Sequence, residues 1–262
     1  MEFPIKEMYN KSYNKSYNED GHNLRYIFPY LKNKELYKYL KIDNESLYYI
    51  SHKNISLKIT NIIIENLEKY KIKKEDLIIT DCTGGVGGDT IQFAQTFRYV
   101  YSIEIDKNRF NYLNNNLNIY GSKNVKIFND DFLNILPIIP NHHVVFIDPP
   151  WGGSDYKNLK NIRLKISNKY ELEDLCEMIL LNNIKKNPLF ICLKLPKNYD
   201  IKYMYRKLNK CSIYLYELNK MIIIIIEKKD ITKLNIFVDK FIKNIISNSI
   251  LNAIQINQTQ SI

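Results

Sequence analysis

An acidic residue, two prolines and an aromatic residue follow a short apolar segment in the middle of the chain. The segment is Val144–Ile147, and Asp148, Pro149, Pro150 and Trp151 come directly after it. Two prolines fix two φ angles and remove two backbone donors, so a strand over the apolar segment must end in a rigid turn. The turn presents a carboxylate, a carbonyl without a strand partner and a flat ring, which together suit the amino group of a stacked nucleobase. The alternative is a proline turn in front of a buried tryptophan.

A glycine-rich segment, residues 84–88, lies between a predicted strand at 77–81 and a helical pattern. Four glycines in five positions let the backbone take positive φ angles and approach a ligand closely. The segment matches neither the dinucleotide fingerprint nor a phosphate loop. Asp81 precedes it, and the next predicted strand, 99–104, ends at Glu104, where nucleoside-binding α/β units present an acid to ribose hydroxyls. These residues favour a ligand with an amino group and a ribose, although each part alone is also compatible with an ordinary turn.

In this order, the glycine segment, the acid and the proline turn resemble the S-adenosylmethionine-dependent methyltransferases. Among them they resemble the trimethylguanosine synthase family, the cap guanine-N2 methyltransferases of RNA. The resemblance covers roughly residues 40–227 and is most specific at 87–94 and 149–156. Weaker matches include Ile103-Glu104-Ile105-Asp106, Asn115-Asn116, Tyr120-Gly121, Asp131-Phe132-Leu133 and Leu195-Pro196-Lys197-Asn198. Two departures stand out. The family loop usually reads Phe-Cys-Gly-Val-Gly-Gly, where this chain has Cys82-Thr83-Gly84-Gly85-Val86-Gly87-Gly88, and the family often has serine where this chain has Asp148.

The resemblance implies that S-adenosylmethionine is the cofactor and that no metal ion takes part. It implies that Asp81 and the glycine loop hold the methionine part, that Glu104 holds the ribose hydroxyls, and that Asp131 and Phe132 hold the adenine. The predicted donor site consists of Asp81, Thr83, Gly84, Gly85, Gly87, Thr90, Glu104, Asp131, Phe132 and Asp148.

The resemblance also implies that the acceptor is the guanine of a 7-methylguanosine cap, with Asp148, Pro149 and Trp151 as catalytic residues. The 7-methyl group makes the ring cationic, so stacking on the indole gains a cation–π contribution. The Pro149 carbonyl and the Asp148 carboxylate are expected to hold the amine in line with the methyl group, so that positioning supplies most of the acceleration. A carboxylate near its ordinary pKa is a weak proton acceptor. Asp148 is therefore expected to offset charge on the nitrogen.

Further substrate contacts are inferred from two other stretches. Lys197 stands where the family has an arginine, and it keeps a point charge for the cap triphosphate without the bidentate fork. Tyr48, Tyr49 and His52 match a region that covers the active face in the family, with ordinary packing as the alternative in a chain of 21 tyrosines. The predicted substrate-binding residues are Trp151, Tyr48, Tyr49, Lys197 and Asn198.

Charge and cysteine content restrict the class of protein. The chain has 262 residues and a formal net charge of +10, which favours an anionic partner. Cations concentrate at 157–169 and 185–210, so a phosphate track beside Trp151 is one interpretation and a solvated lysine-rich surface the other. The four cysteines lack disulfide or metal-ligand spacing, and no apolar run would span a bilayer. We expect a monomer that binds capped RNA and no membrane, inside a nucleus, a cytoplasm or, for a viral protein, a viral factory.

Alternating patterns predict an α/β fold with a Rossmann-like, seven-stranded methyltransferase sheet. The predicted strands are 77–81, 99–104, 125–128, 143–147, 189–193, 211–217 and 220–227, the last two forming an antiparallel hairpin. The predicted helices are 34–40, 56–70, 88–96, 107–119, 131–136, 171–184, 200–208 and 230–247. The predicted organisation is a flexible arm (1–30), a small helical N-terminal extension over the active face (31–75), a methyltransferase domain (76–247) and a polar tail (248–262).

Other functions stay open at this point. One is methylation of an internal guanine in ribosomal or transfer RNA, or of a protein glutamine, because Asp-Pro-Pro followed by an aromatic residue serves several amino acceptors. Trp151 with Gly152-Gly153 behind it favours a cationic base instead, and 262 residues offer no additional RNA-binding domain. Another is a non-catalytic, donor-binding partner that helps a second enzyme hold RNA. The intact combination of glycine loop and proline turn argues against it, since a chain without activity would be free to lose either.

Overall fold

The computed structural model describes residues 24–167, 169–181 and 187–229. The chain divides into two compact units, Met1–Glu227 and Lys228–Ile262. The first unit therefore ends at Glu227, earlier than the boundary at 247 expected from the sequence. Most of the predicted arm, the predicted helix at 230–247 and the predicted tail lie outside the described residues.

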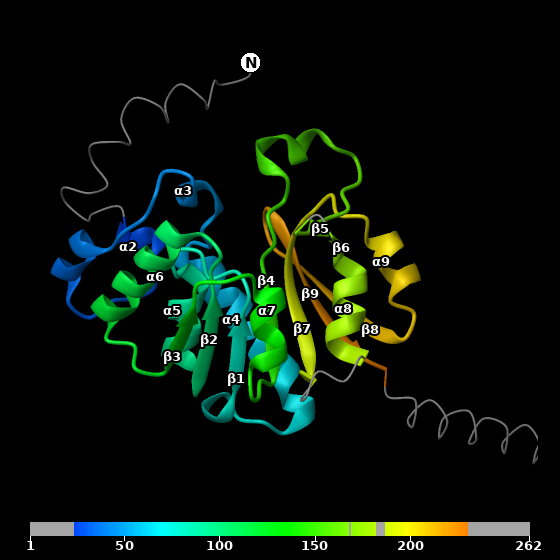
Figure 1. Cartoon of the computed structure of the whole chain (residues 1–262), viewed down its shortest axis with the longest axis horizontal. Helices are drawn as coiled ribbons and strands as arrows, with labels where there is room; N and C mark the ends of the chain where they lie inside the picture. The colour runs from blue at the N-terminus through cyan, green and yellow to red at the C-terminus, as the bar shows by residue number, and fades with distance from the viewer. Residues whose placement is uncertain (1–23, 168, 182–186, 230–262) are drawn as a thin grey trace, which may run out of the picture. The chain divides into compact units, whose positions relative to one another are not determined.

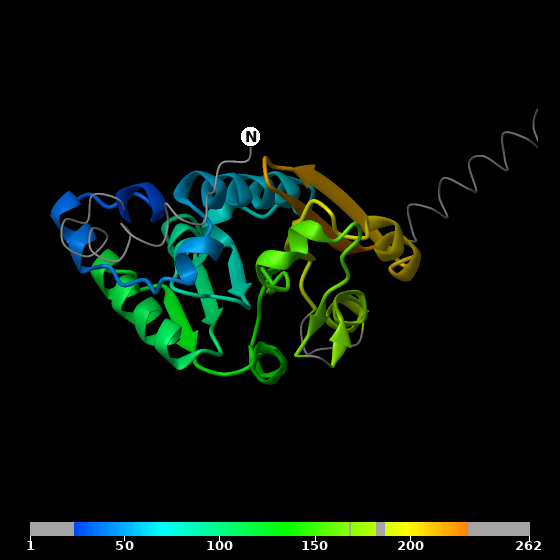
Figure 2. The ribbon, with the colours of Figure 1, turned by 90° about the horizontal axis from the view of Figure 1, so that it is seen from above.

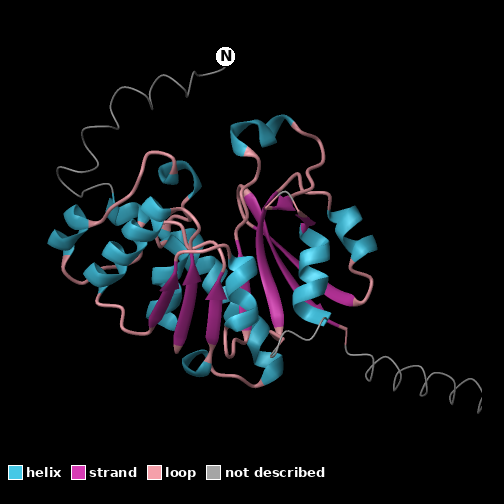
Figure 3. Cartoon of the chain, viewed as in Figure 1, coloured by secondary structure: helices cyan, strands magenta, loops and turns pink. Residues whose placement is uncertain are grey.

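A seven-stranded sheet with the order β3-β2-β1-β4-β7-β9-β8 forms the centre of the first unit (Figure 1). Strands β3, β2, β1, β4 and β7 run parallel, and β9 is antiparallel to β7. The predicted fold class and all seven predicted strands are confirmed (Figure 3). The strands are β1 (Ile78–Asp81), β2 (Tyr99–Ile103), β3 (Val125–Phe128), β4 (Val144–Ile147), β7 (Phe190–Pro196), β8 (Cys211–Glu217) and β9 (Met221–Lys228).

Two features of the sheet differ from the sequence prediction. Strand β7 continues to Pro196, whereas the predicted strand ends at Leu193 because Lys194 interrupts the apolar run. Strands β5 (Lys165–Ile166) and β6 (Tyr170–Glu171) form a separate two-stranded sheet. Two-residue strands are too short for an alternating pattern to be recognised in a sequence.

Helices cover both faces of the sheet (Figure 2). Helices α4 (Lys53–Leu67) and α5 (Gly88–Thr96) pack on one face. Helices α7 (Phe132–Ile135), α8 (Leu172–Leu181) and α9 (Ile201–Lys207) pack on the other. Strands buried on both faces need continuous apolar runs, and all four residues of β4 are buried.

The helical extension packs against the glycine loop and helix α6 (Lys107–Tyr120). Its elements are α2 (Leu24–Ile27), η1 (Lys34–Tyr39) and α3 (Ser46–Tyr49), with η2 (Glu68–Tyr70) and η3 (Lys74–Asp76) after α4. Assigning residues 24–30 to a flexible arm is wrong, because Leu24 and Phe28 are fully buried in the cluster that contains Val86 and Leu113. The remaining short helices are η4 (Leu136–Ile138) and η5 (Gly153–Asn158).

One buried side chain joins the extension to the glycine loop. The Oδ1 atom of Asn116 accepts from the backbone N–H of Lys41 at 2.8 Å, and its Nδ2 atom donates to the Lys41 and Val86 carbonyls, each at 2.8 Å. Because Asn116 is fully buried, water cannot replace these partners.

We expect Asn116→Ala to lower the free energy of unfolding by about 2–3 kcal/mol, since buried backbone groups lose their partner. Urea denaturation measures this change. Asn114 lies exposed on the same helix, so Asn114→Ala is the matched control and should change stability by less than about 0.5 kcal/mol. Equal losses in the two variants would contradict this role of Asn116.

Candidate functional site

The predicted site residues gather where the parallel strands end. The segments after β1, β2 and β4 meet at the upper edge of the sheet in Figure 1, between α3 and η5. Carboxyl ends of parallel strands are where open α/β sheets bind ligands. The fold thus brings the glycine loop, Glu104 and the proline turn to one edge.

Asp81 is buried at the end of β1, and the segments after it hold both of its oxygens. Oδ1 accepts from the N–H of Thr83 at 3.1 Å, and Oδ2 accepts from the Thr90 hydroxyl at 2.6 Å. Burial raises the pKa of Asp81 to about 7, with a further contribution from the charge of Asp89. A cationic amino group bound here would favour the ionised carboxylate. Thr90 therefore supports Asp81 from a fully buried position.

Asp89 is a further acid at this edge that the sequence analysis did not include in the site. Its Oδ2 atom accepts from the Ser51 hydroxyl at 2.6 Å, whereas Oδ1 is buried with no hydrogen-bond partner among the described residues. An unpaired buried acceptor is costly, so it indicates a group that binds there. Asp89 and Asp81 together fit the amino group of a donor's methionine part. Asp89 lies in the first turn of α5. An acid at that position usually stabilises the helix N-terminus, so the sequence gives no sign of a binding role.

The glycine loop is shaped by close packing and by positive φ angles. Gly85 and Gly87 have φ of +54° and +103°, a region that other residues rarely adopt. A Cβ atom on Gly84 would lie 2.3 Å from the Ser102 hydroxyl oxygen, so this position cannot accommodate a side chain. The N–H of Gly84 donates to the carbonyl of Ile103 at 2.8 Å, which fixes the loop over the end of β2.

Glu104 lies beside this loop with its carboxylate held by two backbone groups. Oε2 accepts from the N–H of Gly85 at 2.7 Å and Oε1 from the N–H of Asp106 at 2.8 Å. Burial raises the pKa of Glu104, against the opposing effect of these hydrogen bonds and of Arg109. Each carboxylate oxygen has a second lone pair. The geometry therefore fits a pair of ribose hydroxyls.

The predicted adenine-binding residues lie at the start of α7. Asp131 caps that helix: Oδ1 accepts from the N–H of Leu133 and Oδ2 from the Ser167 hydroxyl, both at 2.9 Å. Phe132 is 8% exposed and packs in the core of this face. Asp131 is thus already engaged, and its contact with adenine stays a prediction.

A hydrogen bond joins the donor loop to the proline turn. The N–H of Asp148 donates to the Thr83 hydroxyl at 2.9 Å. Thr83 belongs to the stretch that departs from the usual family loop. The two parts of the predicted site are therefore coupled, and movement of one displaces the other.

Trp151 is held in place beside the turn, half-buried. Its indole Nε1–H donates to the backbone carbonyl of Lys194 at 3.3 Å, and its ring meets Tyr156 edge-on with centroids 5.3 Å apart. Gly152 has φ of +91° where the chain turns into η5. The Nδ2 atom of Asn198 donates to the carbonyls of Tyr156 and Leu159 at 2.8 and 2.7 Å. Asn198 braces this loop through its Nδ2 atom, and its direct contact with the cap stays a prediction.

Lys194 is the functional candidate that the sequence analysis missed. It is 2% exposed on β7, and its Nζ atom lies 2.5 Å from Oδ2 of Asp148. The sequence analysis counted it only among the cations of the stretch 185–210. A lysine inside the apolar run of a buried strand is a detectable signal, because such a charge needs a partner.

The pKa of Asp148 is not ordinary, contrary to the sequence-based assumption. Burial raises it to about 6, although Lys194 acts in the opposite direction. Lys194 itself is held protonated, because the carboxylates of Asp148 and Asp89 outweigh the effect of burial and raise its pKa. Asp148 is consequently a stronger proton acceptor than an exposed carboxylate.

The extension borders this site through the end of α3. The carbonyl of Tyr49 lies 3.5 Å from Nζ of Lys194. The side chains of Tyr48 and Tyr49 are 64% and 50% exposed, and their contact with a substrate stays a prediction. His52 follows, and burial, Lys220 and Lys194 lower its pKa.

The basic surface is narrower than the sequence suggested, because acids neutralise several cations. Arg163 pairs with Asp200 at 3.2 Å, Lys207 with Asp174 at 3.3 Å and Lys210 with Glu177 at 3.6 Å. Lys197 is half-exposed beyond β7, 3.6 Å from Glu217. The exposed lysines near η5 that take part in no ion pair among the described residues are Lys157, Lys160, Lys165 and Lys169.

No group of three or more His, Cys, Asp or Glu side chains that could hold a metal ion occurs in the described part of the chain. All four cysteines are buried and free. None of the helices within the described ranges is long and apolar enough to cross a membrane.

Comparison with known proteins decides the family. The family model of RNA cap guanine-N2 methyltransferases matches residues 75–239. The chain belongs to this family. It is thus an S-adenosylmethionine-dependent guanine-N2 methyltransferase, as the resemblance implied.

The chain is also similar to several known proteins and, in its fold, to solved structures. The methyltransferase is 38% identical over 222 residues to an uncharacterized protein of Acanthamoeba polyphaga mimivirus, covering 78% of this chain and 85% of that protein. It is 29% identical to the trimethylguanosine synthase of Schizosaccharomyces pombe, over 62% of this chain and 64% of that protein. It is 28% identical to the trimethylguanosine synthase of Saccharomyces cerevisiae, over 69% of this chain and 60% of that protein. A T. thermophilus 16S rRNA N2 guanine methyltransferase, solved with AdoMet and guanosine, shares the fold with TM-score 0.50 and 15% identity, covering 72% of this chain and 44% of that one.

We expect Glu104→Ala to weaken binding of S-adenosylmethionine about 10- to 100-fold, the effect of losing hydrogen bonds to a charged group. Isothermal titration calorimetry measures it without any turnover. Glu65→Ala removes an exposed carboxylate from α4 and should leave donor affinity unchanged. Unaltered affinity in Glu104→Ala would remove Glu104 from the donor site.

Proposed function

We propose that this methyltransferase transfers a methyl group from S-adenosylmethionine to the exocyclic N2 amine of a 7-methylguanosine cap on RNA, giving di- or trimethylguanosine caps. The observation that carries the proposal is the fixed indole of Trp151 beside Asp148 and Pro149, on the strand end next to the donor loop. The family match and the yeast trimethylguanosine synthases among its relatives support it.

The donor supplies a methyl group on a positively charged sulfur. The amine nitrogen forms a bond to the methyl carbon, the carbon–sulfur bond breaks with its electrons going to sulfur, and the nitrogen releases one proton. Because the lone pair of this amine is delocalised into the guanine ring, the chain must orient it. The Pro149 carbonyl and the Asp148 carboxylate do so by accepting from its two N–H groups. With a pKa of about 6, Asp148 also takes up the released proton more readily than an ordinary carboxylate.

The cap ring stacks on Trp151, whose position is fixed before the substrate arrives. Its packing against Tyr156 and its hydrogen bond to β7 reduce the entropy lost on binding. A 7-methylated ring is cationic and gains a cation–π attraction that an unmethylated guanine lacks. The site therefore selects caps that already carry the 7-methyl group.

The remaining contacts follow the RNA away from the ring. Lys197 and the exposed lysines near η5 attract the triphosphate and the first phosphates of the transcript. Tyr48 and Tyr49 lie on the extension beside Lys194 and close over the cap. The protein acts as a monomer on capped RNA wherever such transcripts occur, in nucleus, cytoplasm or a viral factory.

The experiment that tests the proposal offers the protein radiolabelled S-adenosylmethionine with two dinucleotide caps, one 7-methylated and one not. Transfer to the 7-methylated cap alone supports the proposal, and the product mass counts the methyl groups. Transfer to neither cap, with donor binding intact, favours an internal RNA guanine as the acceptor. Donor binding without turnover on any RNA favours the non-catalytic role.

We expect Trp151→Ala to lower kcat/KM for the 7-methylated cap about 10- to 100-fold, since stacking of a base on an aromatic side chain contributes about 1–3 kcal/mol. Donor affinity, measured by calorimetry, should not change. Trp151→Phe keeps a ring and should lose less activity than Trp151→Ala. Full activity of Trp151→Ala would refute the stacking model.

A further inference from the structure

Lys194 occupies an exceptional position for a charged side chain. It is the one lysine or arginine that is buried within the described residues. Three carboxylates surround it: Asp148 in direct contact, and Asp89 and Asp81 close enough to raise its pKa. Strand β7 thus delivers a single cation to a cluster of buried acids.

The same residue contacts both halves of the acceptor site. Its Nζ atom lies 2.5 Å from Oδ2 of Asp148 and 5.7 Å from the centroid of the Trp151 ring. Its backbone carbonyl accepts the indole N–H of Trp151. One position on β7 therefore controls the acid that binds the amine and the ring that stacks the base.

We propose that Lys194 is a positioning residue that keeps Asp148 ionised and fixes its carboxylate at the acceptor amine, so that the two residues act as one unit. A carboxylate has four lone pairs, so Asp148 can accept from Lys194 and from a substrate amine together. The consequence for turnover rests on the proposed function. The effect of Lys194 on the ionisation of Asp148 does not.

Removing either partner alone has a definite physical result. Without Lys194, burial and the neighbouring acids Asp81 and Asp89 would protonate Asp148 near neutral pH, and a protonated acid loses acceptor capacity. Without Asp148, an unpaired ammonium beside Trp151 would repel a cationic base. Two further groups that can carry positive charge on this side are His52 and Lys220, and the charges of both Lys220 and Lys194 lower the pKa of His52. Neither His52 nor Lys220 contacts Asp148 among the described residues, so neither replaces Lys194 as its partner.

The pairing also accounts for the departure at position 148. The serine that the family often has there is neutral and needs no counter-ion. An aspartate in the same partly buried turn is stabilised by one, and Lys194 supplies it from the adjacent strand β7. Asp148→Ser with Lys194→Met removes both charges of this pair.

The direct test measures the pKa of Asp148 by ¹³C NMR of its carboxyl group, with no substrate present. Lys194→Met should raise this pKa by about one to three units, because an opposite charge at contact distance lowers a carboxyl pKa by that amount. Lys202 is exposed on α9, so Lys202→Met is the matched control and should leave the pKa unchanged. An unchanged Asp148 pKa in Lys194→Met would overturn the inference.

The functional test follows kcat/KM for the 7-methylated cap as a function of pH. Activity should rise with pH as Asp148 ionises. The acid limb of the pH–activity profile should therefore move to higher pH in Lys194→Met, by the same amount as the Asp148 pKa measured by NMR. Asp148→Ser with Lys194→Met should lack this limb and should regain thermal stability lost in either single variant. A drop in activity without a shift of the limb would indicate a merely structural lysine. If no cap is methylated, the proposed function fails while the NMR result still decides the role of Lys194.

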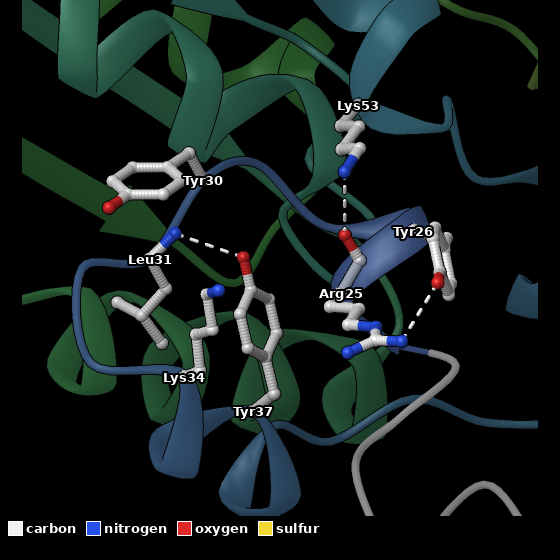
Figure 4. Close-up of a pocket in the computed structure, with 7 residues that line it drawn as sticks. All are labelled: Arg25, Tyr26, Tyr30, Leu31, Lys34, Tyr37 and Lys53. Atoms are coloured by element: carbon white, nitrogen blue, oxygen red, sulfur yellow. Dashed lines mark hydrogen bonds between the residues drawn. The ribbon is translucent and has the colours of Figure 1, made fainter.

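A second, independent observation concerns a cavity of about 360 Å³ in the helical extension (Figure 4). Three cations, Arg25, Lys34 and Lys53, line it together with Tyr26 and Tyr30. None of the three cations forms an ion pair with a carboxylate among the described residues. The Nε atom of Arg25 is buried with no hydrogen-bond partner among the described residues. Its N–H group can therefore donate to an acceptor on a bound ligand.

The cavity is organised by its own contacts. Lys53 donates to the carbonyl of Arg25 at 3.0 Å, and the Arg25 guanidinium donates to the Tyr26 hydroxyl at 2.8 Å. Tyr26 and Tyr30 are 56% and 69% exposed. Exposed aromatic side chains beside cations that no carboxylate neutralises are the composition that binds single-stranded nucleic acid.

We infer that this cavity binds one nucleotide of a single-stranded RNA, with its phosphate at Arg25 and Lys53 and its base on Tyr30. Lys53 directly follows His52, which lies close enough to Lys194 for that charge to lower its pKa. The start of α4 thus links the cavity, through Lys53, to the neighbourhood of Lys194, through His52. A duplex cannot offer an unstacked base and should bind weakly.

Fluorescence anisotropy with a short single-stranded RNA tests this without any methyl transfer. Arg25→Gln and Tyr30→Ala should each weaken binding about 10-fold, and Arg25→Gln should reduce the dependence of log affinity on log salt by about one. Lys58→Gln changes an exposed cation elsewhere on α4 and should have little effect on affinity. Unchanged RNA affinity in both cavity variants would overturn the inference.

Discussion

Three carboxylates lie at one edge of the sheet: Asp81 and Asp89, which are buried, and Asp148, which is partly buried. This concentration of acid is the constraint on which the site depends. Burial raises the pKa of Asp81 to about 7 and that of Asp148 to about 6. Lys194 offsets the charge on the acceptor side. On the donor side, the unpaired oxygen of Asp89 and the carboxylate of Asp81 favour a ligand that brings its own positive charge.

The helical extension takes part in this arrangement. Ser51 donates to Asp89, and the Tyr49 carbonyl lies beside Lys194. Asn116 joins the backbone at Lys41 to the glycine loop. A cover that supplies hydrogen bonds to buried polar groups cannot shift without leaving those groups unpaired, so the extension and the sheet edge behave as one structure.

Donor and acceptor sides are linked as well. The Thr83 hydroxyl receives the N–H of Asp148, so the glycine loop and the proline turn share a hydrogen bond at the point where methyl transfer is proposed. Thr83, Asp148 and Lys194 form a connected group, in which two residues depart from the usual family sequence and the third compensates the new charge.

The sequence by itself determined the strands, the sheet class and the order of the donor-site segments, because apolar runs such as Val144–Ile147 and glycines with positive φ angles are local requirements. It misjudged residues 24–30, whose burial depends on Val86 and Leu113 far along the chain. It did not reveal that the Asn198 amide braces the loop behind Trp151. Only the tertiary structure decided the partner of Asp148, since Lys194 is 46 residues away in the sequence. The two side chains form an ion pair because β4 and β7 lie side by side in the sheet. A pKa depends on burial and on neighbours from other elements, which no local pattern specifies.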